Sequence, residues 1–484
     1  MASLTPPQLA LRWSHSADDI LSLTKQAITK HGEGLDKIAA LPKKDCNFDS
    51  SISVVSAAPA LTNFAISQVF LALAEADTEL SLVTEPLSFY QNVSTSKELR
   101  DASNAAEVLV RDYDVEASMR LDVFEVMVAA EENIKQSSAA LGSEEQRLME
   151  RSLLDGKRAG LALPEKERGE LTMLKKELSQ ASLEFSKNFN EENMFAVWEN
   201  GATDESGFVG YCYLDLFPRE SKYSHAAVWP LLQGFTRSDG TRHYPLAAMV
   251  ANLAKPTPTT PALMQHQDVV TFFHEMGHVF HGLLQCVSGE LTVVRVARDF
   301  VEAPSQMLEN WCFEPAVLER MSSHYETKKP LSRELADKIN KSRHVNVGMF
   351  YLRQVFFAKF DIKVHTEREQ TDYTALWNDL RKSITQVNPG RRAAGQGSFG
   401  HIAGGYDAGY YGYMYSLVFA ADMYATVFKA DPLDPARGAR YSKSILQPGG
   451  SRDESLSLEE FLGRPPNADA FVREIFGETG SANL

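Results

Sequence analysis

A pentapeptide near the middle of the chain, His274-Glu275-Met276-Gly277-His278, has residue types and spacing that suit hydrolytic metal chemistry. Hydrophobic residues around it recur at spacings of three and four, which predicts an α-helix. Residues four apart lie one turn above each other, so both imidazoles project from one face and can meet one metal ion. Glu275 follows His274 around the helix, where its carboxylate can take a proton from metal-activated water. The alternative is a pair of surface histidines on an amphipathic helix.

A hydrolytic zinc site needs three protein ligands and an open fourth position, so one ligand must come from outside this helix. The best candidate is Glu302, within the segment Asp299–Trp311. We predict that this segment forms the next helix, antiparallel to the first after a short loop. Two alternatives stay open. Asp299 and Glu302 also make a D-x-x-E capping box, and Glu309, two turns later, could compete for the metal.

His281 shares a helix face with His274 and His278. However, seven residues of helix place it about 10 Å from His274, so one ion cannot be held by both. We therefore interpret His281 as a packing residue or as an outer partner of the site.

A second group of chemically useful residues lies in a glycine-rich loop. Eight glycines fall between Gly390 and Gly412, and they leave the backbone with little steric restriction. The loop presents His401, Tyr406, Tyr410 and Tyr413, whose N–H and O–H groups could donate to the oxyanion of a tetrahedral intermediate. Movement of the loop could also close the site over a substrate. The alternative is a structural loop whose tyrosines pack by their rings.

The composition is that of an acidic globular protein. The chain has 484 residues, 44% hydrophobic and 23% charged, which is enough for about two or three domains. A net charge of −15 argues against a nucleic acid partner, whose phosphates would be repelled. Four scattered cysteines without CxxC spacing argue against a disulfide framework or a thiolate zinc cluster. Neither a signal peptide nor a membrane-spanning apolar run is visible, so we expect a cytoplasmic protein without a membrane partner.

The elements that must position these residues differ between the two halves of the chain. From Thr5 to about Asn190 the pattern is helical, with a capping box at Ser16–Asp19 and Pro164 suited to the first turn of a later helix. That helix carries an apolar seam from Leu171 to Phe189, which we expect to pack against neighbouring helices.

The sequence pattern changes from helical to strand-like at Met194. We predict strands at 195–198, 208–217 and 244–253, with a turn from Gly201 to Gly207. An exposed strand edge in such a sheet could pair with an extended peptide. After the metal-motif helix we predict helical stretches at 331–366 and 373–386, the glycine-rich loop, a helix around 417–428, and a polar C-terminal segment.

Three motifs in this order resemble one known family. The pentapeptide 274–278, the segment Asp299–Trp311 and the loop Gly400–Tyr413 together resemble the thimet oligopeptidase/neurolysin family of zinc metallopeptidases, oligopeptidase family M3. The stretches 204–211 and 449–453 are also similar. The resemblance covers most of residues 194–478 and, more loosely, the helical half before them.

The resemblance implies a mainly α, two-lobed, zincin-type helical metallopeptidase with a small β-sheet beside the His-Glu-x-x-His helix. It implies an N-terminal helical domain at 1–190 and a catalytic domain at 194–484. The family normally has a long helical region between the positions equivalent to Asn190 and Phe195, so we expect an incomplete N-terminal lobe and a shortened member. The segment 285–295 also departs from the family's loop before the third ligand.

The resemblance also assigns roles to single residues. It implies one Zn²⁺ per chain, held by His274, His278 and Glu302, with Glu275 as the general base. The matching positions of the glycine-rich loop are expected to contact the scissile carbonyl or the peptide backbone. They are His401 and Tyr410, which we expect to act in catalysis, and Tyr406 and Tyr413, which we expect to bind substrate.

We therefore expect a zinc-dependent endopeptidase that hydrolyses short oligopeptides by metal-activated water, acting as a monomer in the cytoplasm; some family members are also mitochondrial. The alternative, from another functional class, is a catalytically inactive, shortened relative that binds peptides or a partner. Such a chain would expose apolar surface along the 171–189 seam. Metal content and peptide turnover distinguish the two.

Overall fold

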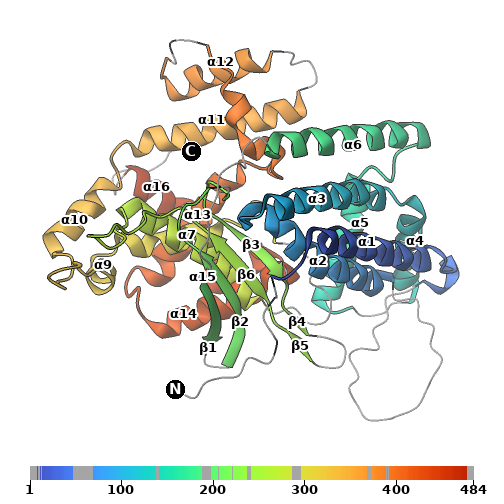
Figure 1. The fold of residues 1–484 in the computed structure, drawn as a ribbon, viewed down its shortest axis with the longest axis horizontal. Helices are drawn as coiled ribbons and strands as arrows, with labels where there is room; N and C mark the ends of the chain where they lie inside the picture. The colour runs from blue at the N-terminus through green and yellow to red at the C-terminus, as the bar shows by residue number, and fades with distance from the viewer. Residues whose placement is uncertain are drawn as a thin grey trace.

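The computed structural model describes residues 13–46, 69–137, 141–187, 198–204, 207–220, 222–236, 241–285, 296–367, 372–388 and 392–476, together with residues 8, 11 and 390. Most of this chain is helical, and one small sheet lies between the N-terminal and the C-terminal helices (Figure 1). The expected mainly α fold with a small sheet beside the metal-motif helix is therefore confirmed. Among the residues described, no helix is both long enough and apolar enough to cross a lipid bilayer.

Several helices precede the sheet, and four of them share a hydrophobic core. Within the described residues they are α1 (Ala17–Ala39), α2 (Val69–Val93), α3 (Lys97–Ser118), α4 (Leu121–Ser137), α5 (Ser143–Arg158) and α6 (Glu165–Lys187), with the short turn η1 (Lys43–Asp45) after α1. The predicted capping box begins α1. The Ser16 hydroxyl accepts the amide N–H of Asp19 at 3.1 Å, and the Asp19 carboxylate accepts that of Ser16 at 2.9 Å. Buried side chains from α1, α2, α4 and α5 form one hydrophobic cluster that holds this region together.

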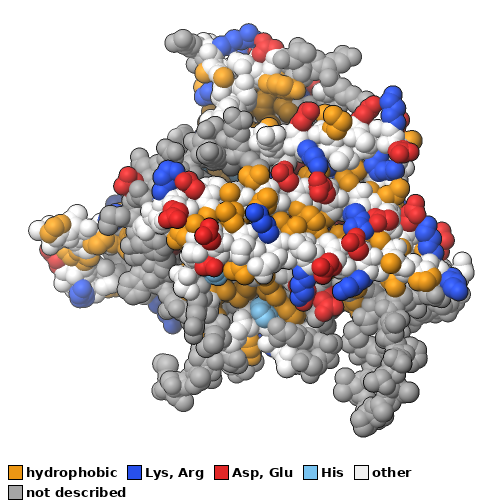
Figure 2. Space-filling view, turned by 45° about the vertical axis from the view of Figure 1, so that its right-hand side comes forward, with side chains coloured by type: hydrophobic (Ala, Val, Ile, Leu, Met, Phe, Trp, Pro, Cys, Tyr) orange, Lys and Arg blue, Asp and Glu red, His pale blue; other side chains and the backbone are white. Residues whose placement is uncertain are grey.

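The helix α6 exposes much of its predicted apolar seam. Leu174 and Leu178 are each 61% exposed, and the adjacent Met173 is 66% exposed. The expectation that the seam packs against neighbouring helices is therefore wrong at these positions. The helix α6 packs mainly against α3 and the short 3-10 helix η6 (Gly400–Ala403), and these two elements leave another flank of α6 uncovered. Figure 2 shows apolar side chains between acidic and basic ones on the outer face of the N-terminal helices. The side chain of Phe185, and Phe189 as a whole, lie outside the described residues.

The sheet has four strands in the order β1 (Trp198–Asp204), β2 (Gly207–Asp215), β6 (Leu246–Val250) and β3 (Ala227–Leu232). The central pair β2 and β6 is parallel, and the two outer strands are antiparallel to their neighbours. Every residue of β6 is buried. Its side chains alternate between a cluster shared with α2 and a cluster shared with α7 (His266–Leu284), so helices cover both faces of the sheet.

Two features of the sheet differ from the sequence prediction. Gly201 is not in a turn: β1 continues through Asp204, with Gly201 opposite Tyr211 and a bulge between Ala202 and Thr203. The strand β3 was not predicted, since Pro230 interrupts its pattern; an edge strand tolerates proline because one side of its backbone makes no ladder bonds. A two-stranded pair, β4 (Phe235–Thr236) and β5 (Arg242–His243), follows β3. Residues 195–197, the expected start of the first strand, lie outside the described residues.

Helices of 3 to 20 residues follow the metal-motif helix. Among the described residues they are α8 (Ala303–Leu308), η4 (Glu309–Phe313), α9 (Pro315–Met321), α10 (Arg333–Ser342), α11 (Val347–Thr366), α12 (Tyr373–Thr385), η5 (Gly395–Ser398), η6, α13 (Gly412–Met423), η7 (Tyr424–Phe428), α14 (Pro435–Tyr441), η8 (Ser442–Leu446), η9 (Gly449–Ser451), α15 (Glu454–Leu462) and α16 (Asp469–Phe476). The predicted helical stretch 331–366 is divided at Asn346, whose φ of 59° is left-handed. The C-terminal segment, predicted as polar only, contains helices that bury Leu458 and Phe461.

Buried charges join the N-terminal helices to the sheet. Asp215, at the end of β2, pairs with the Arg219 guanidinium and with the Lys222 ammonium, and all three residues are buried. Lys222 also donates to the main-chain oxygens of Asp215 and Phe217 at 2.8 Å, while Arg219 donates to the main-chain oxygen of Val93 at the end of α2. Buried charges need partners of this kind, so this junction fixes α2 against the carboxyl ends of the parallel strands.

The helices α7 and α8 approach each other closely at Gly277. A Cβ atom at this position would lie 2.5 Å from the Cα of Ser305 and 3.0 Å from the main-chain oxygen of Pro304. Glycine is therefore required for the contact, and the contact is what brings the start of α8 beside the histidines of α7.

We predict that Gly277→Ala lowers the free energy of unfolding by about 1–3 kcal/mol, because the added methyl group forces the two backbones apart. Urea denaturation measures this. The matched control is Gly282→Ala on the same helix, where no atom lies within 4 Å of the added Cβ. Since alanine favours helix more than glycine, the control should be unchanged or more stable by up to about 1 kcal/mol. Equal stability of Gly277→Ala and the wild type would contradict the close approach.

Candidate metal centre

Three side chains predicted as metal ligands converge in the structure. Glu302 Oε2 lies 3.3 Å from His274 Nε2 and 3.1 Å from His278 Nε2. One ligand atom from each of the three lies within 4.8 Å of the others. In a tetrahedral site with bonds of about 2.1 Å, neighbouring ligand atoms are about 3.4 Å apart, so this arrangement fits a single zinc-sized ion. Two imidazoles and one carboxylate are also a donor set of catalytic zinc sites, which leave a fourth position open.

Two of the three candidate ligands, His274 and Glu302, have a further partner that fixes their orientation. The carboxylate of Glu309 lies 2.7 Å from His274 Nδ1, which leaves His274 Nε2 facing Glu302. Glu302 is 3% exposed, and its Oε1 accepts the Tyr406 hydroxyl at 2.6 Å. The Ser305 hydroxyl lies 3.2 Å from Glu302 Oε2. Carboxylates and hydroxyls behind the ligands are typical of metal sites, since they set the histidine tautomer and hold the donor atoms in place.

The electrostatics of the cluster favour a bound cation. Burial lowers the pKa of His274, but the hydrogen bonds to Glu302 and Glu309 outweigh it and raise this pKa to about 10. Burial raises the pKa of Glu302, yet the hydrogen-bonded His274 and His278 bring it well below its usual range. The site therefore stabilises positive charge between the Glu302 carboxylate and the imidazoles. Burial raises the pKa of Glu275, which is 6% exposed and adjoins His274 in the chain.

The capping role that the sequence left open for Glu302 is not seen in the structure. The helix α8 begins after Glu302, which occupies the N-cap position without a side-chain capping bond. Asp299 accepts the Tyr411 hydroxyl at 3.0 Å. The capping box of Asp299 and Glu302 is therefore not formed, and the segment is a six-residue helix with a 3-10 extension rather than one longer helix. Glu309 contacts the far nitrogen of His274 and does not join the three converging atoms.

His281 lies inside the protein. It is 5% exposed, and its Nε2 has no hydrogen-bond partner within the part of the chain that the structure describes. Burial lowers its pKa to about 4, so the ring is neutral and packs as an uncharged side chain.

The glycine-rich loop brings its aromatic residues together beside Glu302. The Tyr406 and Tyr413 rings are stacked at 5.1 Å with an interplanar angle of 16°, and the His401 ring contacts the rings of Tyr406, Tyr410 and Tyr413. His401 Nε2 lies 3.3 Å from the Tyr413 hydroxyl. These residues therefore form one cluster, linked to the metal ligands through Tyr406.

The hydroxyls of this cluster have different partners. Tyr410 donates to Gln354 Oε1 of α11 at 2.9 Å, whereas Tyr406 donates to Glu302. Sequence reasoning missed Gln354, the Glu309–His274 contact and the Tyr406–Glu302 contact. These contacts could not be predicted from the sequence spacing of the residues that make them, because the folding of the loop brings these residues together. The one available signal was that Glu309 lies two helical turns beyond Glu302.

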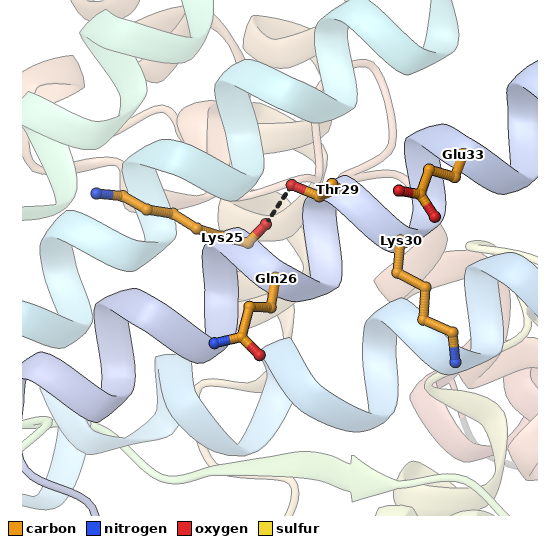
Figure 3. Close-up of a pocket in the computed structure, with 5 residues that line it drawn as sticks. All are labelled: Lys25, Gln26, Thr29, Lys30 and Glu33. Carbon is orange, nitrogen blue, oxygen red and sulfur yellow. Dashed lines mark hydrogen bonds between the residues drawn. The ribbon is translucent and has the colours of Figure 1, made fainter.

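Two hollows lie near the N-terminal helices. Figure 3 shows a shallow one along α1, lined by Lys25, Gln26, Thr29, Lys30 and Glu33. All five side chains come from a single helix surface, so nothing converges there. A cavity of about 550 Å³ lies between the N-terminal helices and residues 296–298, which lead directly to Glu302. The larger cavity therefore adjoins the segment that carries the third candidate ligand.

The chain is similar in sequence to oligopeptidases. The profile of peptidase family M3 matches residues 171–476. A thimet-like oligopeptidase of Dictyostelium discoideum is 43% identical over 278 residues, which cover 56% of this chain and 41% of that protein. Saccharolysin of Saccharomyces cerevisiae is 43% identical over 296 residues, 59% of this chain and 41% of that protein. The chain thus spans about two fifths of the length of the curated relatives it matches.

A solved structure shares the fold at low sequence identity. The Trypanosoma cruzi metallocarboxypeptidase 1 superposes with a TM-score of 0.55 at 12% identity, covering 84% of this chain and 98% of that one. This likeness concerns the fold alone. The sequence match carries the classification: since the M3 profile covers well over half of the residues, this chain belongs to peptidase family M3.

Proposed function

We propose that this chain is a zinc-dependent endopeptidase that hydrolyses short oligopeptides. The observation that carries the proposal is the convergence of His274, His278 and Glu302 on one point, with Glu275 beside it in the chain. Family membership supports the reaction class, and the names of the matched oligopeptidases support peptides as substrates. We further propose that the chain is a cytoplasmic monomer. Its proposed partners are short peptide substrates, with neither a nucleic acid nor a membrane among them.

His274 Nε2, His278 Nε2 and a carboxylate oxygen of Glu302 would hold the ion. Bound there, zinc would supply Lewis acidity, which polarises a peptide carbonyl and lowers the pKa of water. With the ion bound and His274 neutral, the contact between Glu309 and Nδ1 would favour the tautomer whose Nε2 lone pair faces the site. Tyr406 restrains Glu302 from the opposite side through its other carboxylate oxygen.

Glu275 is the proposed general base. Its carboxylate takes a proton from the attacking water and then passes it to the leaving amine nitrogen. Burial raises its pKa, which makes the carboxylate a stronger base than it would be in water.

The glycine-rich loop would stabilise the charge that develops on the carbonyl oxygen. We propose His401 and Tyr410 as the donors to this oxygen, and Tyr406 and Tyr413 as contacts to the peptide. Tyr410 donates to Gln354 in this structure, so its proposed role requires that the hydroxyl exchange this acceptor for the oxyanion when substrate binds. The cavity beside residues 296–298 has a volume of about 550 Å³, within the usual range of ligand pockets, and we propose that it takes part of a short peptide.

One observation favours a second function. The exposed apolar side chains Met173, Leu174 and Leu178 fit a catalytically inactive, shortened relative that binds peptides or a partner. Such a chain would hold zinc and bind peptide without cleaving it. Turnover of a short peptide by the wild-type chain, with its zinc content measured on the same sample, separates the two functions.

We predict that Glu275→Gln lowers kcat for a short fluorogenic peptide by about 10²- to 10⁴-fold, since the amide cannot accept the proton. Zinc content should stay at one ion per chain. The control is Glu334→Gln, the same chemical change at a side chain that is 79% exposed on α10, and its kcat should equal that of the wild type. Turnover retained by Glu275→Gln would contradict the assigned base.

We predict that Glu309→Gln weakens zinc binding by about 10- to 100-fold, because the neutral amide no longer fixes the tautomer and basicity of His274. Competition with a fluorescent chelator at constant pH measures the affinity, with Glu334→Gln again as the control. An unchanged affinity would show that the contact does not support the site.

We predict that zinc binding to the metal-free chain at pH 7 releases about one proton, since binding requires a neutral imidazole. With its pKa raised to about 10, the metal-free His274 is protonated at pH 7 and must lose this proton, so affinity should increase as the pH rises. Titration calorimetry in two buffers of different ionisation enthalpy counts the proton. A binding heat independent of the buffer would count against this protonation state.

A further inference from the structure

A buried carboxylate outside the metal cluster has no role in the chemistry above. Asp361 lies on α11, one face of which packs against the glycine-rich loop, and its side chain is 1% exposed. A carboxylate this deeply buried is costly unless each oxygen is satisfied by donors. The partners of Asp361 therefore indicate what the residue is for.

Two of these partners are main-chain amides of the glycine-rich loop. The N–H of Ala408 donates to Asp361 Oδ1 at 3.0 Å, and the N–H of Tyr410 donates to Oδ2 at 3.0 Å. Ala408 has a φ of 54°, a left-handed backbone conformation that residues other than glycine seldom adopt. A left-handed residue turns successive amides toward one side, as in anion-binding nests, so both N–H groups can meet one carboxylate.

The third partner comes from α11 itself. His365, one turn beyond Asp361, places its Nδ1 3.0 Å from Asp361 Oδ1 and 2.8 Å from the main-chain oxygen of Asp361. The hydrogen bond to Asp361 raises the pKa of His365. The Asp361 carboxylate therefore contacts His365 on its own helix and two amides of the glycine-rich loop.

The same helix holds the loop at further points. Gln354, about two turns before Asp361, accepts the Tyr410 hydroxyl at 2.9 Å. The Phe357 ring stacks on Phe399 at 4.9 Å and meets the Tyr410 ring edge-on at 5.5 Å. One face of α11 therefore contacts the loop on both sides of His401.

These contacts connect Asp361 to the metal cluster through the loop. The two amides bound by Asp361, those of Ala408 and Tyr410, follow Tyr406 by two and four residues along the same short turn, and the Tyr406 hydroxyl donates to Glu302. We propose that Asp361 is a positioning residue, which fixes the turn at 408–410 so that His401, Tyr406 and Tyr410 face the metal ligands. This inference rests on the proposed peptidase function of the same site.

The test is Asp361→Asn. The amide keeps the size of the side chain but turns one of its two acceptors into a donor that faces a loop N–H, and it removes the charge. Misplacement of the loop should lower kcat by about 10- to 100-fold, with KM within about threefold and zinc content unchanged. The matched control is Asp379→Asn on α12, the same substitution at a side chain that is 73% exposed, which should leave kcat and KM unchanged.

A second readout does not depend on peptidase activity. Amide hydrogen exchange in the peptide covering residues 404–412 should be at least about tenfold faster in Asp361→Asn, because two hydrogen bonds to a charged acceptor are weakened. If the wild-type chain cleaves no peptide, the proposed function fails, but the exchange rates still test the contact. If Asp361→Asn does not fold, Gln354→Leu releases Tyr410 instead, and a kcat loss without a change in zinc content would support the role of α11.

Two results would overturn the proposal. The first is an unchanged exchange rate at 404–412 in Asp361→Asn, since the carboxylate would then not hold the turn. The second is faster exchange with kcat within about threefold of the wild type, which would show that the turn does not position the reacting groups.

Discussion

The structure depends on one buried carboxylate placed between two imidazoles. Glu302 is almost fully removed from water, and such a charge is stable only where positive charge or hydrogen-bond donors replace the water. His274 and His278 face one of its oxygens, while the Tyr406 hydroxyl occupies the other. The N-terminal end of α8 must therefore lie against α7, and only the absence of a side chain at Gly277 lets it do so.

Successive contacts hold this arrangement from the outside. The helix α11 holds the glycine-rich loop, the loop holds Glu302 through Tyr406, and Glu309 holds His274. On the other side of α7, the buried strand β6 supplies an apolar surface against which the helix packs. His274, Glu302 and Tyr406 are thus each held by a neighbouring side chain within the candidate site, as electrostatic preorganisation requires.

Local patterns in the sequence predicted the elements that follow from periodicity. The spacing of His274 and His278 on one helix and the capping box at Ser16 depend on neighbours within a few residues, and both are present. The strand β3 was missed because its proline is tolerated only at the edge of a sheet, a property of the assembled sheet rather than of the segment. The exposed flank of α6 was missed because an apolar stripe does not specify whether a neighbour is present to cover it.

The candidate site was predictable to a similar extent. Spacing identified the two histidines but left Glu302 among alternatives, and the resemblance to a family, rather than the spacing, favoured it. The contacts of Tyr406 with Glu302 and of Asp361 with the turn at Ala408 join residues separated by 104 and 47 positions. Such pairs form only when the chain folds back on itself, so no local pattern encodes them.

The junction of Asp215, Arg219 and Lys222 has a consequence for the boundaries of the folding unit. The match to the M3 profile begins at residue 171. The guanidinium of Arg219, however, donates to the main-chain oxygen of Val93, far upstream of that residue. The region that the family profile matches and the region that this buried contact joins therefore begin at different places in the chain. A gene fragment that begins at residue 171 would encode the whole candidate metal centre and yet leave the buried cation of Arg219 facing the gap where α2 belongs.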